Sequence, residues 1–138
     1  MSGSCGVGAT MIFDTDVLIW FLRGDSRAAR LIESQSDRAA SIVSAMELLQ
    51  GARSRGEIKT IHQFIQQSGI RLVSVSESIG HVALSLIEAH ALGQGLRVAD
   101  ALIAATAREA ALPLATGNAR RFRAIAGLEV KVFRPGAD

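Results

Sequence analysis

The segment Met11–Trp20, MIFDTDVLIW, places acidic residues inside an otherwise apolar run. Met11–Phe13 has the character of a short buried strand, and Asp14 is a residue type that often caps the N-terminus of a helix. The apolar residues that follow predict a helix ending near Gly24. A carboxylate in an apolar setting needs a capping role or a positive partner, because an unpaired buried charge is costly. The segment therefore predicts a strand, an acid and a helix, in that order.

The same order of elements recurs along the rest of the chain. Further strands are expected at 39–43, 70–75, 112–116 and 128–133, and further helices at 26–32, 57–67, 76–92, 98–110 and 118–125. Another helix should begin at Ser44, because Ser44 and Glu47 have the Ser-x-x-Glu spacing of a capping box. Strands that alternate with helices, without a hairpin signal, predict parallel pairing. The expected fold class is α/β, a three-layer α/β/α sandwich around a parallel sheet of four to five strands.

The totals agree with one ordinary globular domain. The chain has 138 residues, of which 49% are hydrophobic and 20% charged. Residues 1–10, MSGSCGVGAT, lack the basic start and the apolar stretch of a secretory signal, so we expect a flexible leader followed by a single domain at 11–135. The longest apolar run is too short to span a membrane. Cys5 has no partner cysteine, which fits a reducing compartment, and the expected location is the cytoplasm.

The basic residues are mostly arginine. The formal net charge is +2, and the chain contains thirteen arginines and two lysines. A guanidinium group presents a planar fork of donors that matches a phosphate group, so this surface is compatible with nucleic acid. A high genomic GC content also favours arginine over lysine and explains the composition equally well. Charge alone therefore does not decide the function.

Several acids are expected at one edge of the sheet. Asp14 and Glu47 follow expected strands, as does the segment Thr116-Gly117-Asn118, and Asp100 lies near the start of an expected helix. The carboxyl ends of parallel strands meet at one edge, and ligands of open α/β sheets bind beyond that edge. These segments, far apart in the sequence, should therefore lie close together in the fold.

Each acid also has a simple structural explanation. Asp14 or Asp16 could be a helix N-cap, and Glu47 could complete the capping box. Asp100 could sit in the first turn of its helix, where the helix dipole favours it, and pair with Arg97. Taken one at a time, these roles account for each acid without any chemistry.

Taken together, Asp14, Glu47 and Asp100 predict a metal site. Two unit charges 4 Å apart repel each other by about 4 kcal/mol at an effective dielectric constant of 20, and a divalent cation turns that repulsion into attraction. Oxygen ligands without histidine or cysteine favour Mg²⁺ or Mn²⁺ over Zn²⁺. Magnesium held by few carboxylates keeps positions for water and for a substrate phosphate. Hydrolysis of a phosphodiester is the reaction that this set of residues suits best.

Four blocks of the sequence resemble the PIN-domain ribonucleases and, within them, the VapC-type toxins of prokaryotic toxin–antitoxin pairs. The blocks are FDTDVLIWFL, the Glu of SAMELLQGA, VADALIAATA and TGNARRF, and they occur in order over about 11–133. The resemblance implies a Mg²⁺- or Mn²⁺-dependent endoribonuclease that acts on tRNA, ribosomal RNA or mRNA. It also implies a homodimer that a cognate antitoxin protein neutralises.

The resemblance assigns roles to individual residues. It implies that Asp14 and Asp100 are direct metal ligands. Glu47 is the third acid of the metal site and either holds a metal-bound water or acts as a base. Thr15 could orient Asp14 or a water molecule, and Asp16 has a supporting position.

The block TGNARRF departs from the family pattern. Many relatives have a fourth acid there, at the position of Asn118 or just before the Phe, where this chain has Arg121. Asn118 is still expected to be a catalytic residue, because an amide can hydrogen-bond a water or bind a metal weakly. We expect one firm metal site and a second completed only by the RNA phosphate. Arg120 and Arg121 could bind that phosphate or could be solvated helix surface.

Three other classes of function are alternatives to a ribonuclease. Asp14-Thr15-Asp16 after a strand also resembles the haloacid dehalogenase phosphatases, but Leu18 stands where those proteins have Thr or Val, and no closing acidic pair follows. A catalytically weak PIN-fold module that binds RNA or protein is the non-enzymatic alternative. The uncharged Asn118, in place of an acid, is the feature that favours it. A dinucleotide-binding domain is excluded because no Gly-x-Gly-x-x-Gly follows the first strand.

Overall fold

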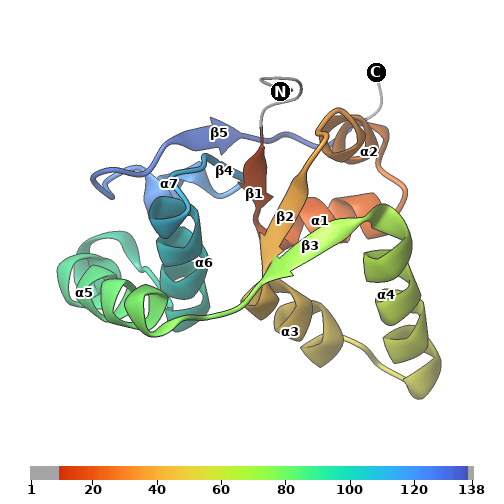
Figure 1. Ribbon diagram of the computed structural model, residues 1–138, viewed down its shortest axis with the longest axis horizontal. Coiled ribbons are helices and arrows are strands. Elements are labelled where there is room, and N and C mark those ends of the chain that lie inside the picture. The colour runs from red at the N-terminus through yellow and green to blue at the C-terminus, as the bar shows by residue number, and fades with distance from the viewer. Residues whose placement is uncertain (1–9, 137–138) are drawn as a thin grey trace, which may run out of the picture.

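The computed structural model, which describes residues 10–136, contains five parallel strands in one sheet (Figure 1). The strands are β1 (Met11–Phe13), β2 (Arg38–Ser41), β3 (Ile70–Val73), β4 (Leu114–Thr116) and β5 (Val130–Val132). Their order in the sheet is β3-β2-β1-β4-β5, and every neighbouring pair is parallel. The predicted α/β fold is confirmed. The predicted leader lies, apart from Thr10, outside the described residues.

Helices cover both faces of this sheet (Figure 1). They are α1 (Thr15–Leu22), α2 (Ser26–Glu33), α3 (Ile42–Gln50), α4 (Arg55–Ser68), α5 (Glu77–Gln94), α6 (Val98–Glu109) and α7 (Ala119–Phe122). One apolar core is formed with α5, α6 and α7, and a second core on the opposite face is formed with α1, α2 and α4. The α3 helix contributes Val43 to the first core and Leu48 to the second. Within residues 10–136, no helix has the length and apolar character needed to cross a membrane.

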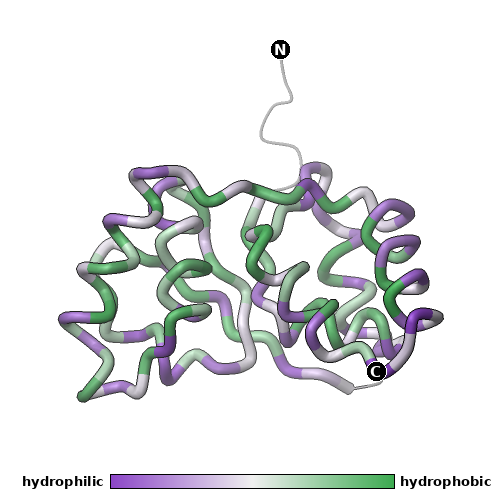
Figure 2. The backbone as a smooth tube through the Cα atoms, turned by 90° about the horizontal axis from the view of Figure 1, so that it is seen from below, coloured by the Kyte–Doolittle hydropathy of each residue, from purple (hydrophilic) through white to green (hydrophobic). Residues whose placement is uncertain are grey.

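The two cores follow from the alternation of side chains along each strand. In β1, Ile12 points into the first core, whereas Met11 and Phe13 belong to the second. In β4, Leu114 and Ala115 alternate in the same way. Because both faces of the sheet are covered at its centre, β1 and β4 are buried along their whole length, whereas β5 at the edge is partly exposed. Hydrophobic and hydrophilic residues are interspersed along the helical turns, as expected for helices that place one face on a sheet (Figure 2).

The strand order places a switch point between β1 and β4. The chain runs from β1 to β2 and β3 on one side, and then crosses through α5 and α6 to β4 on the other side of β1. In open α/β sheets, ligands bind beyond the carboxyl ends of the strands at such a switch point. Asp14 directly follows β1, and Gly117 directly follows β4.

The start of α3 differs from the prediction. The helix begins at Ile42 and its N-cap is Ser41, whose side chain accepts a hydrogen bond from the Val43 amide at 3.1 Å. Ser44 lies inside the helix and is fully buried, so the predicted capping box is wrong. The chain turns directly from β2 into α3 because Ser41 is both the last strand residue and the cap. Glu47 consequently lies in the second turn of α3 rather than the first.

We predict that Ser41→Ala lowers the free energy of unfolding by about 1 kcal/mol, because the substitution removes the cap of α3. Urea denaturation followed by circular dichroism measures this change. Ser85→Ala, on the exposed face of α5, is the matched control and should change stability by less than about 0.5 kcal/mol. Equal stability of the Ser41 variant and wild type would contradict the assigned cap.

Candidate acidic site at the strand switch point

Asp14 is the centre of the site and connects three elements. Its side chain is buried, with 5% of the residue exposed. One oxygen, Oδ1, accepts a hydrogen bond from the Thr15 amide at 2.8 Å and caps α1. The other, Oδ2, accepts a hydrogen bond from the Thr116 hydroxyl at 2.7 Å, at the end of β4. Asp14 therefore caps α1, as predicted, and also lies at the carboxyl edge of the sheet where the acids were predicted to meet.

The surroundings of Asp14 make its negative charge unfavourable. Burial is the largest cause and raises the pKa of Asp14 from the usual 3.8 to about 7, although the hydrogen bond from Thr116 opposes it. The negative charges of Asp16 and Asp100 are smaller contributions to this raised pKa of Asp14. Asp14 therefore lies near two other carboxylates without enough positive charge nearby to balance them.

Asp16 is tied to the segment after β4. Its Oδ2 accepts a hydrogen bond from the Gly117 amide at 2.8 Å, while its buried Oδ1 has no hydrogen-bond partner in the described structure. Burial raises the pKa of Asp16 as well. A Cβ atom at Gly117 would lie 2.5 Å from Asp16 Oδ2, so a larger residue there would require the Asp16 side chain to move. No sequence pattern around Gly117 indicates this contact, because it exists only between two distant segments.

Glu47 joins the site through Thr15. The Thr15 hydroxyl donates a hydrogen bond to Glu47 Oε1 at 2.6 Å and also lies 3.0 Å from Ser44 Oγ. Thr15 therefore contacts Asp14 through its amide and Glu47 through its side chain. Glu47 itself is half-buried. The structure brings Glu47 to the site from the second turn of α3.

Asp100 is held at the start of α6. Its Oδ2 accepts a hydrogen bond from the Arg97 amide at 3.1 Å, which caps the helix. The expected pairing with Arg97 is therefore a backbone hydrogen bond. The ionic partner is Arg121, whose Nη1 lies 3.4 Å from the same oxygen. Arg121 was expected to bind phosphate or to be solvated helix surface, and its contact with Asp100 was not predicted.

Asn118 and Arg120 are exposed at the edge of the site. The Asn118 amide donates a hydrogen bond to Thr116 Oγ1 at 3.0 Å, but its side chain does not cap α7. The predicted catalytic role of Asn118 stays a prediction. Arg120 and Arg123 line a hollow of about 470 Å³ together with the end of α5 at Gly93 and Gln94.

The donor atoms fit a hard divalent cation. They are carboxylate oxygens, they repel one another, and Asp16 has an oxygen without a partner. Among the described residues, however, no three His, Cys, Asp or Glu side chains are arranged to hold a metal ion. Mg²⁺ needs only one or two carboxylates, because it keeps several of its waters. The assignment of Asp14 and Asp100 as metal ligands, and the three-acid ligand set that includes Glu47, stay predictions.

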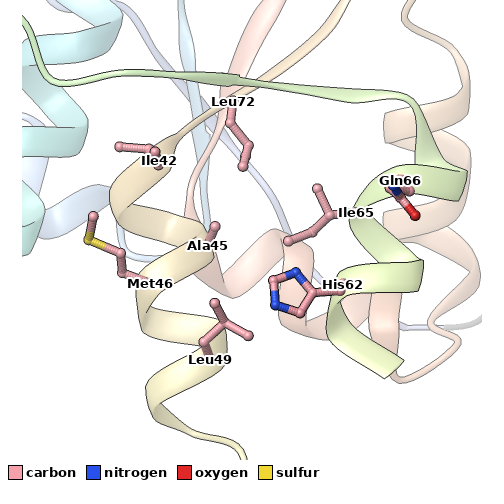
Figure 3. A pocket seen from close by; sticks show the side chains of 8 residues that line it. All are labelled: Ile42, Ala45, Met46, Leu49, His62, Ile65, Gln66 and Leu72. Atoms are coloured by element: carbon pink, nitrogen blue, oxygen red, sulfur yellow. The ribbon is translucent and has the colours of Figure 1, made fainter. Parts of the chain in front are cut away.

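Two grooves lie on the side of α3 and α4. One, of about 550 Å³, runs between these helices and contains no acid (Figure 3). It is lined by Ile42, Ala45, Met46, Leu49, His62, Ile65, Gln66 and Leu72. The other, of about 420 Å³, includes Glu47 and combines apolar side chains of α1, α3 and α4 with Arg23, Arg53 and Glu57. The second groove therefore adjoins the acidic site.

Comparisons with known proteins place these features in context. The PIN domain model matches residues 11–128. A toxin–antitoxin complex from Klebsiella pneumoniae is 27% identical with a TM-score of 0.70, covering 86% of this chain and 94% of that chain. FitAcB from Neisseria gonorrhoeae is 25% identical with a TM-score of 0.68, covering 87% of this chain and 95% of that chain. VapBC-1 from nontypeable Haemophilus influenzae is 18% identical and shares the fold with a TM-score of 0.74. The match covers 89% of this chain and 97% of that chain. No curated protein sequence matches the chain.

We predict that Asp14 makes the metal-free protein less stable as the pH rises. The folded-state pKa of about 7 exceeds the usual 3.8, so the folded protein binds the proton more tightly. The resulting stabilisation is complete below about pH 4 and is lost as the pH rises through 7. Asp14→Asn cannot ionise, so wild type should lose up to about 4 kcal/mol relative to this variant between pH 4 and 8.

Urea denaturation in the presence of EDTA at several pH values measures this difference. Asp37→Asn, which changes an exposed carboxylate before β2, is the matched control and should follow wild type. If Asp14→Asn and wild type show parallel pH dependence, the carboxylate is not protonated in the folded protein near neutral pH.

Proposed function

The chain belongs to the PIN domain family, and we propose that it is a Mg²⁺- or Mn²⁺-dependent endoribonuclease, the toxin of a toxin–antitoxin pair of the VapBC type. The observation that supports this most is the group of Asp14, Asp100 and Glu47 at the switch point between β1 and β4. We propose that residues 11–135 form the nuclease domain. Because the family is established, the haloacid dehalogenase alternative is dropped.

Asp14 and Asp100 are the residues that would hold the cation. When bound, a divalent cation supplies positive charge to the phosphate and makes a water molecule a stronger nucleophile. The buried position of Asp14 favours cation binding, because a positive partner stabilises a buried carboxylate more than an exposed one. In our proposal Glu47 completes the acid set, either as a ligand or through a water molecule.

Glu47 is the proposed general base. It is half-buried, so its carboxylate can reach water, and the Thr15 hydroxyl holds one of its oxygens. The base removes a proton as the water oxygen forms a bond to phosphorus. The bond from phosphorus to one ribose oxygen breaks, and that oxygen takes up a proton. Asn118, exposed beside Thr116, is proposed to hydrogen-bond the water or the phosphate.

The basic hollow between α5 and α7 is consistent with a polynucleotide as the proposed substrate. Arg120 and Arg123 are exposed there, on the short helix and turn that follow the site. Guanidinium groups in this position can bind phosphates of the strand on either side of the cleaved bond. The sequence contains five Phe, one Trp and no Tyr, so recognition should depend on RNA shape and backbone charge more than on base stacking. Candidate targets are tRNA, ribosomal RNA and mRNA.

An antitoxin is the proposed protein partner. The similarity to the Klebsiella pneumoniae toxin–antitoxin complex supports this. The groove that includes Glu47 offers apolar residues flanked by charged ones, a surface that suits an amphipathic segment. A segment bound there would lie next to the proposed base. We also propose that the protein acts as a homodimer in the cytoplasm.

We predict that Asp14→Asn and Asp100→Asn each lower Mg²⁺-dependent RNA cleavage by about 100-fold or more, because each removes charge that would hold the cation, and every tenfold loss corresponds to about 1.4 kcal/mol. Cleavage of total RNA by the purified protein, with and without EDTA, measures this. Asp37→Asn should cleave like wild type. Cleavage that persists in both site variants would indicate a contaminating nuclease and would refute the assignment.

We predict that induced expression arrests bacterial growth and that Asp14→Asn abolishes the arrest, because toxicity requires the intact site. A small reading frame beside the gene should encode the antitoxin, and its co-expression should restore growth. RNA sequencing after induction identifies the target. Growth arrest that is unchanged in the Asp14→Asn variant would contradict toxicity by RNA cleavage.

A further inference from the structure

We propose that the guanidinium group of Arg121 takes the place of a second metal ion, so that the site holds one divalent cation and Arg121 itself binds the phosphate that is cleaved. This inference rests on the proposed nuclease function. It concerns a residue at which the sequence departs from the pattern that the family resemblance implies.

The guanidinium group lies within the acidic site. Arg121 Nη1 is 3.4 Å from Asp100 Oδ2, and the Asp100 side chain is only 13% exposed. Oδ2 also accepts the hydrogen bond from the Arg97 amide, so both of these contacts use one oxygen of the carboxylate. The other oxygen, Oδ1, is left for a metal ion. Arg121 can therefore contact Asp100 while Asp100 binds a cation.

The backbone of Arg121 is held in place from both sides. Next to it, Phe122 is fully buried in the core formed with α5 and α6. The Arg121 amide donates a hydrogen bond to the Asn118 carbonyl at 3.0 Å, and the Asn118 amide donates to Thr116 Oγ1. That same hydroxyl donates to Asp14. The position of Arg121 is therefore coupled to the central acid of the site.

The Arg121 side chain has donors left for a substrate. A guanidinium group has five N–H donors, and in the structure one nitrogen contacts Asp100. About 40% of the side chain is exposed. The contact of 3.4 Å is longer than a close charge-assisted hydrogen bond, so the group is not locked onto Asp100. The remaining donors match the paired oxygens of a phosphate group.

The charge balance disfavours a second divalent ion. The permanent positive charge of the Arg121 guanidinium group near Asp100 repels another cation, and Asn118 brings no negative charge to offset it. A purely structural ion pair is the competing explanation for the contact. Half-exposed pairs of that kind contribute little to stability, and such a role would not alter the number of bound ions.

Counting Mn²⁺ ions tests the proposal directly. Calorimetric titration and electron paramagnetic resonance with MnCl₂ alone should give one tightly bound ion per chain for wild type and for Arg121→Gln. Arg121→Glu should bind a second ion, because it replaces the repelling charge with a ligand. Arg55→Gln, at an exposed arginine at the start of α4, is the matched control and should bind one ion.

RNA cleavage and RNA binding test the phosphate contact. Arg121→Gln should cleave RNA at least about 10-fold more slowly than wild type at saturating Mn²⁺, and Arg55→Gln should cleave normally. Arg121→Lys keeps the charge but loses the fork, so it should bind one ion and show intermediate cleavage. Thermal unfolding in EDTA checks that each variant is folded, and Arg121→Lys serves as the test if Arg121→Gln is not.

The proposal is overturned if wild type binds two Mn²⁺ ions with similar affinity. It is also overturned if Arg121→Gln cleaves as fast as wild type, or if that variant gains a second ion and cleaves faster. If wild type cleaves no RNA at all, the proposed nuclease function fails separately. The ion count then still tests the exclusion of a second metal, and weaker binding of a labelled RNA by Arg121→Gln in EDTA still tests the phosphate contact.

Discussion

The buried carboxylate of Asp14 at the end of β1 is the constraint on which the rest of the acidic site depends. Removal from water, with a smaller contribution from the neighbouring acids, raises the pKa of Asp14 to about 7. Hydrogen bonds from Thr15 and Thr116 hold the carboxylate between α1 and β4. The site therefore combines strong positioning with a deficit of positive charge, which is the condition under which a divalent cation binds well.

Capping and function are served by the same side chains. Asp14 uses one oxygen to cap α1 and the other to accept a hydrogen bond from β4. Asp100 caps α6 through the oxygen that also contacts Arg121. Each helix start thereby fixes the position of an acid, because the rigid backbone of the first turn supplies one of its hydrogen bonds. The structural and functional explanations of these acids, which the sequence left as alternatives, are compatible.

The N-cap of α3 and the partner of Asp100 differ from the predictions because contacts beyond the local sequence decide them. Ser41 and Ser44 both precede an apolar helical segment, and Glu47 follows Ser44 at the spacing of a capping box. The pairing of β2 with β3 extends to Ser41 opposite Val73, so the strand ends there and the helix begins directly after it. Only the sheet register distinguishes the two serines. Arg97 was likewise a plausible ionic partner for Asp100 by spacing, but the structure uses its amide.

The sequence by itself determined the alternation of strands and helices, the α/β class and the acids at the ends of strands. These features depend on periodicity and on neighbouring residues, which local physics sets. The tertiary structure alone decided the strand order, the close approach of Asp16 to Gly117 and the contact of Arg121 with Asp100. Those contacts join segments far apart in the chain, and their geometry depends on how the helices pack on the sheet, which no local pattern specifies.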